Sequence, residues 1–218
     1  MSSLRIRYQT LEFDDVDIHV RTLRDKQQYS DAEGVAEELG ISSTIWSLFG
    51  VVWPSSEVLA HLMFSYDIAG KKILEVGCGI GLSSLVLNHR LADITATDYH
   101  PEVGGFLLKN VALNCGNKIP FVRTGWADDD NDNTLGQFDM VIGSDLLYEG
   151  DHVDLLAGFI NAHAKPQCEV ILVDPGRSYH GRFSKKMVAL GYAHHYNKPD
   201  QADYLEQPFR GRILHYNR

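Results

Sequence analysis

The residues best suited to chemistry are an acid and three glycines that follow an apolar run. The run ends in Glu75, and Gly77, Gly79 and Gly81 follow at intervals of two residues. Apolar residues within 82–87 then recur at the spacing of one helical face, which predicts a strand, a glycine turn and a helix. Glycines let the backbone approach a ligand closely, and a helix N-terminus offers that ligand free N–H groups.

Two classes of ligand bind at such a turn. Dinucleotide folds need the pattern G-x-G-x-x-G, but here the third glycine comes one residue early and Glu75 takes the position that would face a phosphate. A carboxylate there suits a cationic ligand better. The pattern E-V-G-C-G-I-G resembles the first motif of class I S-adenosylmethionine-dependent methyltransferases, whose cofactor carries an ammonium and a sulfonium. The alternative is a structural turn that binds no ligand.

A second acid lies where such a cofactor needs one. Residues 94–97 have the composition of a strand that ends in Asp98, about 20 residues after the turn. An acid in that position can accept hydrogen bonds from both ribose hydroxyls. We therefore place Asp98 and the adjacent Tyr99 on the cofactor side of the site, together with Ser144 at the end of a later strand.

The candidate catalytic residues are Asp145 and Tyr148, which follow an expected strand at 138–144. The alternative is that Asp145 caps the next helix and Tyr148 packs, but their position after the cofactor strands favours a functional role. Nucleic-acid amino-methyltransferases carry N/D-P-P-Y/F/W here, where the prolines shape a slot for a flipped base, whereas this chain has two leucines. We expect Asp145 to capture and orient an amine, with Tyr148 as a second hydrogen-bond partner.

The elements that would position these residues alternate along the chain as strand and helix. Such alternation predicts an α/β fold with a doubly wound, mostly parallel, Rossmann-like sheet whose ligands bind at the carboxyl ends of the strands. A helix-free tail is expected to add an antiparallel pair at one edge, which makes the sheet seven-stranded. The expected strands are 73–76, 94–98, 121–124, 138–144, 170–173, 192–196 and 213–216.

The N-terminal region is expected to form an extension of residues 1–45 packed on a single globular domain of residues 46–218. Alternating apolar and polar residues predict a hairpin within 6–20. Capping-box spacing predicts a short helix over 30–40 that ends at a glycine.

Composition and charge limit the class of partner. The chain of 218 residues is 44% hydrophobic and 22% charged, which is typical of a folded globular protein, and its formal net charge is −9. This acidity argues against a general nucleic-acid-binding surface. It fits a basic protein segment or a small molecule better.

Other features indicate the compartment and exclude some cofactors. The three cysteines have no metal-ligand spacing and are interpreted as reduced thiols of an intracellular protein. The sequence shows neither a run of transmembrane length nor a signal-peptide core in residues 1–30. The histidines have no ligand spacing beside cysteines or carboxylates, so we expect no metal. We expect a cytoplasmic monomer that binds neither membranes nor nucleic acids.

Further segments extend the resemblance beyond the glycine turn. Val52-Trp53-Pro54-Ser55, the helix 107–114, Trp126 after the third strand and the D-x-x-Y of Asp145 and Tyr148 occur in the expected order. Together they are similar to methyltransferase family 16, the seven-β-strand protein-lysine methyltransferases. The resemblance implies that Trp53 and Trp126 contact the cofactor and that the D-x-x-Y lies beside the transferred methyl.

The activity implied is transfer of a methyl group from S-adenosylmethionine to a lysine ε-amine of a specific protein. A lysine has an unperturbed pKa near 10.4, so presenting it as the neutral amine at pH 7 costs about 4–5 kcal/mol. Burial and the cofactor's sulfonium lower the pKa of that amine, and we assign no general base. The alternatives are a small-molecule N- or O-methyltransferase with the same cofactor site, and a cofactor-binding pseudoenzyme that acts as an interaction module.

Overall fold

The computed structural model describes residues 4–25, 34, 38, 41, 46–127 and 135–218. The helix expected over residues 30–40 lies outside the described residues, apart from Gly34 and Glu38. None of the helices in the described part of the chain has the length and apolar character needed to cross a membrane.

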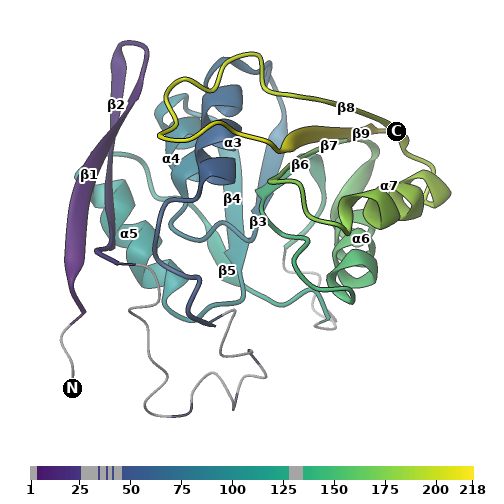
Figure 1. Ribbon diagram of the computed structural model, residues 1–218, viewed down its shortest axis with the longest axis horizontal. Coiled ribbons are helices and arrows are strands. Elements are labelled where there is room, and N and C mark those ends of the chain that lie inside the picture. Colours follow the sequence, from purple (N-terminus) through teal and green to yellow (C-terminus); the bar gives the residue numbers. More distant parts are fainter. Residues whose placement is uncertain (1–3, 26–33, 35–37, 39–40, 42–45, 128–134) are drawn as a thin grey trace.

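A seven-stranded sheet forms the centre of the molecule, with the strand order β5-β4-β3-β6-β7-β9-β8 (Figure 1). The first five strands in this order are parallel, whereas β9 pairs antiparallel with both β7 and β8. This arrangement confirms the doubly wound sheet and the antiparallel pair expected at its edge. The strands are β3 (Lys72–Val76), β4 (Asp93–Asp98), β5 (Phe121–Arg123), β6 (Phe138–Ser144), β7 (Ala164–Asp174), β8 (Ala193–Asn197) and β9 (Arg212–Asn217).

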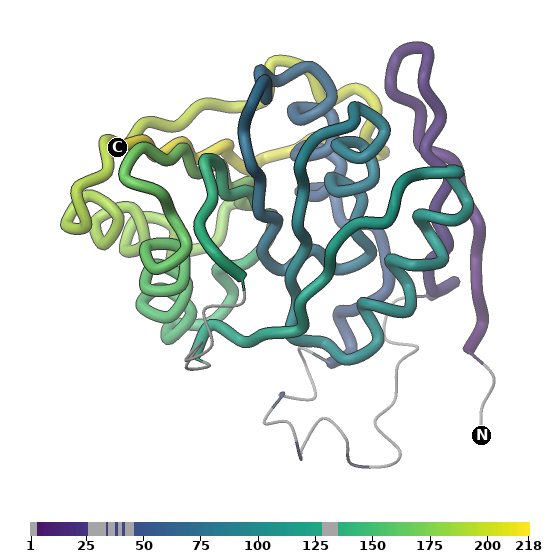
Figure 2. The backbone as a smooth tube through the Cα atoms, turned by 180° about the vertical axis from the view of Figure 1, so that it is seen from behind, coloured from purple at the N-terminus to yellow at the C-terminus, as the bar shows by residue number. Residues whose placement is uncertain are grey.

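Helices cover both faces of this sheet (Figures 1 and 2). Helices α3 (Pro54–Ser65), α4 (Leu82–His89) and α5 (Val103–Leu113) share one apolar cluster with one face of the sheet. Helices α6 (His152–His163) and α7 (His180–Ala189) share a second cluster with the other face. The molecule is therefore a three-layer α/β structure, as the alternation of strands and helices predicts.

The central strands β3 and β6 are mostly apolar because both of their faces are buried. In β3, Ile73 belongs to the cluster with α3–α5, whereas Leu74 and Val76 belong to the cluster with α6 and α7. Side chains alternate between the faces of a strand, so Glu75 lies on the same face as Ile73, beneath α4.

The N-terminal hairpin forms a separate two-stranded sheet of β1 (Ile6–Phe13) and β2 (Val16–Leu23). It lies alongside α5 in both views (Figures 1 and 2). Asn110 of α5 and Asn114, directly after that helix, hold it through its backbone. The N–H of Arg21 donates to Asn110 Oδ1 at 2.7 Å, and that of His19 donates to Asn114 Oδ1 at 2.8 Å. The expected hairpin is thus present and is bonded to a helix of the main sheet.

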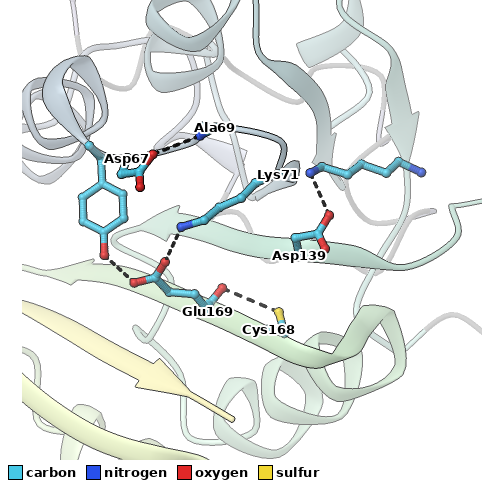
Figure 3. A network of polar contacts seen from close by, with 8 residues as sticks. Asp67, Ala69, Lys71, Asp139, Cys168 and Glu169 are labelled. Carbon is cyan, nitrogen blue, oxygen red and sulfur yellow. Dashed lines mark hydrogen bonds and ion pairs between the residues drawn. The ribbon is translucent and has the colours of Figure 1, made fainter.

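A polar network anchors the start of β3, at the end opposite the glycine turn (Figure 3). The side chains of Tyr66 and Lys71 both donate to the carboxylate of Glu169 on β7, and the N–H of Lys72 donates to Asp139 on β6 at 2.9 Å. These contacts fix the connection from α3 to β3 against two neighbouring strands. The start of the strand that carries the glycine turn is therefore fixed by side chains of β6 and β7.

Candidate active site

A cavity of about 460 Å³ lies at the carboxyl ends of β3, β4 and β6. Its volume is within the range of small-molecule sites in proteins. The parallel strands place their last residues at this edge, which brings together segments far apart in the sequence. Nine of the residues that the sequence singled out line the cavity: Trp53, Gly77, Gly79, Asp98, Tyr99, Trp126, Ser144, Asp145 and Tyr148.

The middle glycine of the turn opens onto the cavity. Gly79 has a φ of +56°, and a Cβ atom built on it would meet nothing within 4 Å. A Cβ on Gly77 would instead meet the side chain of Leu146 at 2.5 Å, and the φ of +61° there also favours glycine. Backbone approach to a ligand is therefore available at Gly79, and a side chain there would project into free space.

Asp98 ties the glycine turn to the end of β4. Its Oδ2 accepts a hydrogen bond from the N–H of Gly79, and its Oδ1 accepts one from the N–H of His100, both at 2.9 Å. Burial raises the pKa of the Asp98 carboxyl, and these backbone hydrogen bonds oppose the rise by stabilising the charged form. Each oxygen has a second lone-pair direction with which it can accept from a ligand hydroxyl.

Glu75 and Gly81, which the sequence placed on the cofactor side, do not line the cavity. Glu75 is 3% exposed, and its carboxylate accepts hydrogen bonds from both the N–H and the hydroxyl of Ser84 in α4. Burial raises the pKa of Glu75 to about 7. The expectation that Glu75 faces a ligand is therefore corrected: the strand's alternation turns the side chain toward the first turn of α4. Gly81 precedes that helix, and a Cβ on it would meet Leu107 at 2.5 Å.

The chain changes direction sharply at Asp145, just beyond β6. Asp145 has a φ of +55°, and its N–H donates to the carbonyl of Val173 at 2.9 Å. Its Oδ1 accepts from Arg177 Nε at 2.6 Å. Helix α6 begins after Asp151, so Asp145 does not cap it and that alternative is excluded.

The aromatic side chains near Asp145 are held by one histidine. The ring of His152 makes edge contacts with the rings of Trp126 and Tyr148, at centroid distances of 5.1 and 4.7 Å. Burial raises the pKa of the Tyr148 hydroxyl well above its usual range, so this group stays protonated at neutral pH. No motif in the sequence singled out His152, whereas the structure places it on the cavity wall.

Arg177 is a further cavity residue that sequence reasoning missed. Nearby Asp174, the last residue of β7, is 2% exposed and does not line the cavity. Asp174 Oδ1 accepts hydrogen bonds from the N–H groups of Gly176 and Arg177, each at 2.8 Å. One feature of the sequence does indicate Arg177: it follows the end of β7 by three residues, and residues just after the strand ends at this edge form the cavity wall.

His100 forms the base of the aromatic wall on the other side. Its ring stacks on that of Phe49 with a centroid distance of 4.2 Å and contacts the ring of Trp46 at 4.4 Å. Burial, with a contribution from Arg123, lowers the pKa of His100 to about 4, so the imidazole is neutral at pH 7. Trp53 precedes Pro54, the first residue of α3, and its indole N–H donates to the carbonyl of Leu48 at 3.2 Å.

Potential metal ligands do not gather around this cavity. Over the described ranges of the chain, His, Cys, Asp and Glu side chains form no group of three that could hold a metal ion. The cysteines Cys78, Cys115 and Cys168 are free thiols.

Comparison with known proteins places this site in a family. The calmodulin-lysine N-methyltransferase of Arabidopsis thaliana is 26% identical over 150 residues, which are 64% of this chain and 49% of that protein. The histidine protein methyltransferase 1 homolog of Dictyostelium discoideum is 31% identical over 117 residues, 51% of this chain and 38% of that protein. The chain thus spans about half the length, or less, of these curated relatives.

The fold is also shared with solved structures. The 16S rRNA N2 G1207 methyltransferase of T. thermophilus, in complex with AdoMet and guanosine, aligns with a TM-score of 0.65 at 18% identity. The alignment covers 99% of this chain and 51% of that one, which shows a common fold. Residues 36–187 match the protein family described as lysine methyltransferase, and the chain belongs to that family.

Proposed function

We propose that this protein is an S-adenosylmethionine-dependent methyltransferase that methylates the ε-amine of a lysine on a specific protein. The observation that carries the proposal is that one cavity wall joins the glycine turn and Asp98 to Asp145 and Tyr148. The glycine turn and Asp98 suit a nucleoside cofactor, and Asp145 and Tyr148 suit a polar acceptor. Membership of the lysine methyltransferase family supports the same reading.

The residues present fit the cofactor. Gly79 offers backbone that a ligand can approach without meeting a side chain, and Asp98 offers carboxylate oxygens to ribose hydroxyls. Trp53, Tyr99 and Trp126 supply apolar and aromatic wall for the remainder. When bound, S-adenosylmethionine supplies a methyl group made reactive by the positive charge on its sulfur.

On the acceptor side, the protein's task is to position the amine and to exclude water. Asp145 and the Tyr148 hydroxyl flank the acceptor position and can both hydrogen-bond the amine, since both line the cavity. The raised pKa of Tyr148 keeps its hydroxyl neutral across the working range, so it adds no charge that would favour the ammonium. Glu149 also lines the cavity, with a side chain that is 49% exposed, and its charge has the sign that attracts a basic segment.

Methylation of a cell lysate tests the proposal. The purified protein is incubated with tritiated S-adenosylmethionine and lysate, and protein, nucleic acid and small molecules are then separated. We expect tritium in the protein fraction and, by mass spectrometry, a gain of one or more methyl groups on lysine. Tritium confined to small molecules or to nucleic acid would refute the proposed acceptor, and tritium nowhere would support the pseudoenzyme.

An imidazole acceptor is a second candidate, favoured by the similarity to a histidine protein methyltransferase. The pH dependence of the rate separates the two chemistries. A free imidazole has a pKa near 6.5, so its neutral form is already abundant at pH 7.5, whereas a lysine amine continues to gain its neutral form toward pH 9. We expect a rate that climbs from pH 7 to 9, together with methyl groups mapped to lysine.

We further propose that the protein acts as a monomer in the cytoplasm. Its free thiols, two of them buried, suit a reducing compartment. We also propose that residues 1–45 are an extension on a single globular unit of residues 46–218. The separate two-stranded sheet of the hairpin supports that division.

A further inference from the structure

Arg177 is the one lysine or arginine among the described residues that line the cavity. It shares that wall with the carboxylates of Asp98, Asp145 and Glu149. Its guanidinium is bonded to the carboxylate of Asp145, and its Cζ lies 5.5 Å from the centre of the Tyr148 ring. The cation therefore contacts both of the residues that the proposed function assigns to the acceptor amine.

This ion pair is held in place by the backbone around it. The Asp174 carboxylate fixes the N–H of Arg177, and the N–H of Asp145 is bonded to the carbonyl of Val173 one residue before Asp174. Side-chain exposure is 35% for Arg177 and 16% for Asp145, so water screens the pair only in part. A partly buried pair of this kind has a larger effect on nearby charges than an exposed one.

The pair resolves a conflict in the proposed chemistry. A carboxylate without a counter-ion would hold the lysine as its ammonium, which has no lone pair with which to attack the methyl carbon. A guanidinium already bonded to that carboxylate cancels this attraction and repels a second cation. The neutral amine can still donate a hydrogen bond to the Tyr148 oxygen, which leaves its lone pair free to attack the methyl carbon.

We propose that Arg177 is a positioning residue that occupies the cation site at Asp145, so that the acceptor lysine binds there as the neutral amine. This inference rests on the proposed function. The ammonium leaves its proton in water on entry, and the amine nitrogen then uses its lone pair to form the N–CH₃ bond. The S–CH₃ bond breaks with its electrons kept by sulfur, and the positively charged product is repelled by Arg177.

Other groups that titrate face the same space and must be considered in any pH experiment. They come from each element that borders the cavity: Cys78, Asp98, Tyr99, His100, Tyr148, Glu149 and His152, with buried Asp174 behind Arg177. Replacing Arg177 leaves every one of these residues in place, but it also removes a charge that lowers the pKa of the Tyr148 hydroxyl. In Arg177→Gln that raised pKa rises further, so Tyr148 stays protonated across the pH range of the test. A shift of the kcat midpoint therefore reports on the loss of the Arg177 charge beside Asp145.

The test compares Arg177→Gln, Arg177→Lys and a control, Arg182→Gln. Arg182 forms a similar bond of 2.6 Å to Asp154, but with side-chain exposures of 56% and 48% and away from the cavity wall. The acceptor is the protein that became labelled in the lysate experiment, purified and added at a saturating concentration. The kcat for its methylation is measured from pH 6.5 to 9.5. Calorimetric affinity for S-adenosylmethionine confirms that each variant is folded.

We expect Arg177→Gln to move the midpoint of the kcat profile upward by about one pH unit and to lower kcat at pH 7 about tenfold. Arg177→Lys should stay near wild type because it keeps the charge, and Arg182→Gln should not change. An unaltered midpoint in folded Arg177→Gln would overturn the inference. If the wild type labels no protein, the proposed function has failed instead.

A second measurement needs no acceptor protein. Binding of n-butylammonium at pH 7 is followed by NMR on the indole N–H signals of Trp53 and Trp126, which line the cavity in both proteins. We expect Arg177→Gln to bind this cation at least several-fold more tightly than wild type, because the carboxylate of Asp145 is released. Equal affinity in the two proteins would show that Arg177 does not hold the cation site.

Discussion

The carboxylate of Asp98 accepts a hydrogen bond from the backbone N–H of Gly79 at 2.9 Å, across 19 residues of sequence. The bond joins the end of β4 to the turn that follows β3. It makes the two elements of the proposed cofactor site a single rigid unit, so each depends on the other for its position. We therefore expect a substitution at either residue to reduce cofactor affinity more than it reduces the stability of the fold.

Replacing Asp98 by alanine should weaken S-adenosylmethionine binding by at least tenfold. The variant loses the bond that holds Gly79 and the oxygens offered to the ribose, and hydrogen bonds to a charged group contribute about 1.5–3 kcal/mol each. Calorimetry on the two proteins measures the change, and NAD should bind neither. Asp139→Ala serves as the control, because Asp139 is an acid at the start of β6, the end of that strand opposite the cavity. Unchanged affinity in Asp98→Ala would contradict the assignment.

Gly79→Val should abolish cofactor binding while the protein remains folded. The branched side chain would project into space that is free within 4 Å, and only the positive φ opposes it locally. Circular dichroism checks the fold and calorimetry checks the binding. Gly158→Ala, in the middle of α6, has equal room and should bind the cofactor as wild type does. Normal binding by Gly79→Val would place the cofactor elsewhere.

The alternation of strands and helices and nine residues of the cavity wall were accessible from sequence because apolar runs and strand ends are local signals. Side-chain direction was less accessible. Glu75 shares a motif with cavity residues, yet the alternation of β3 turns it toward Ser84. Arg177 belongs to no motif, and its partner Asp145 is 32 residues away. Pairings of this kind depend on how loops return to the sheet edge, which neither spacing nor composition encodes.

Asp145→Asn and Tyr148→Phe should keep cofactor affinity and lose most of the methyl transfer. Both residues are placed on the acceptor side, so their loss removes hydrogen bonds to the amine and leaves Gly79 and Asp98 untouched. In Asp145→Asn the ion pair with Arg177 is also lost. Calorimetry and the tritium assay measure the two properties separately. Full activity in Asp145→Asn would show that the acceptor lies elsewhere.

Glu75 should make stability depend on pH. Its pKa rises from 4.5 to about 7 on folding, so between those values the unfolded chain is ionised while the folded protein keeps the proton. Stability must then fall as pH rises through this window, by about 3 kcal/mol in all. Urea unfolding of wild type at pH 5 and pH 8 is compared with that of Glu75→Gln, which cannot ionise. The variant should show a clearly smaller fall; equal falls would exclude Glu75 as the cause.

Asn110 should be among the most important polar residues for stability, because it links the hairpin to the glycine turn. It is fully buried; its Oδ1 accepts from the N–H of Arg21, and its Nδ2 donates to the carbonyl of Ile80 at 3.0 Å. Asn110→Ala leaves two backbone groups without this partner, each at about 1–3 kcal/mol. We expect a loss of about 3 kcal/mol in urea unfolding, with weaker S-adenosylmethionine binding because Ile80 lines the cavity.

Asn114→Ala is the matched control for this prediction. Asn114 makes the equivalent bonds one helical turn later, to the N–H and carbonyl of His19, but in an exposed position where water can replace it. It should therefore lose only about 1 kcal/mol and keep its affinity for the cofactor. If Asn110→Ala and Asn114→Ala lost the same stability, burial of the hydrogen bonds would not explain the importance of Asn110. If only the stability of Asn110→Ala fell and its cofactor affinity stayed at the wild-type value, the hairpin would be a structural support with no influence on the glycine turn.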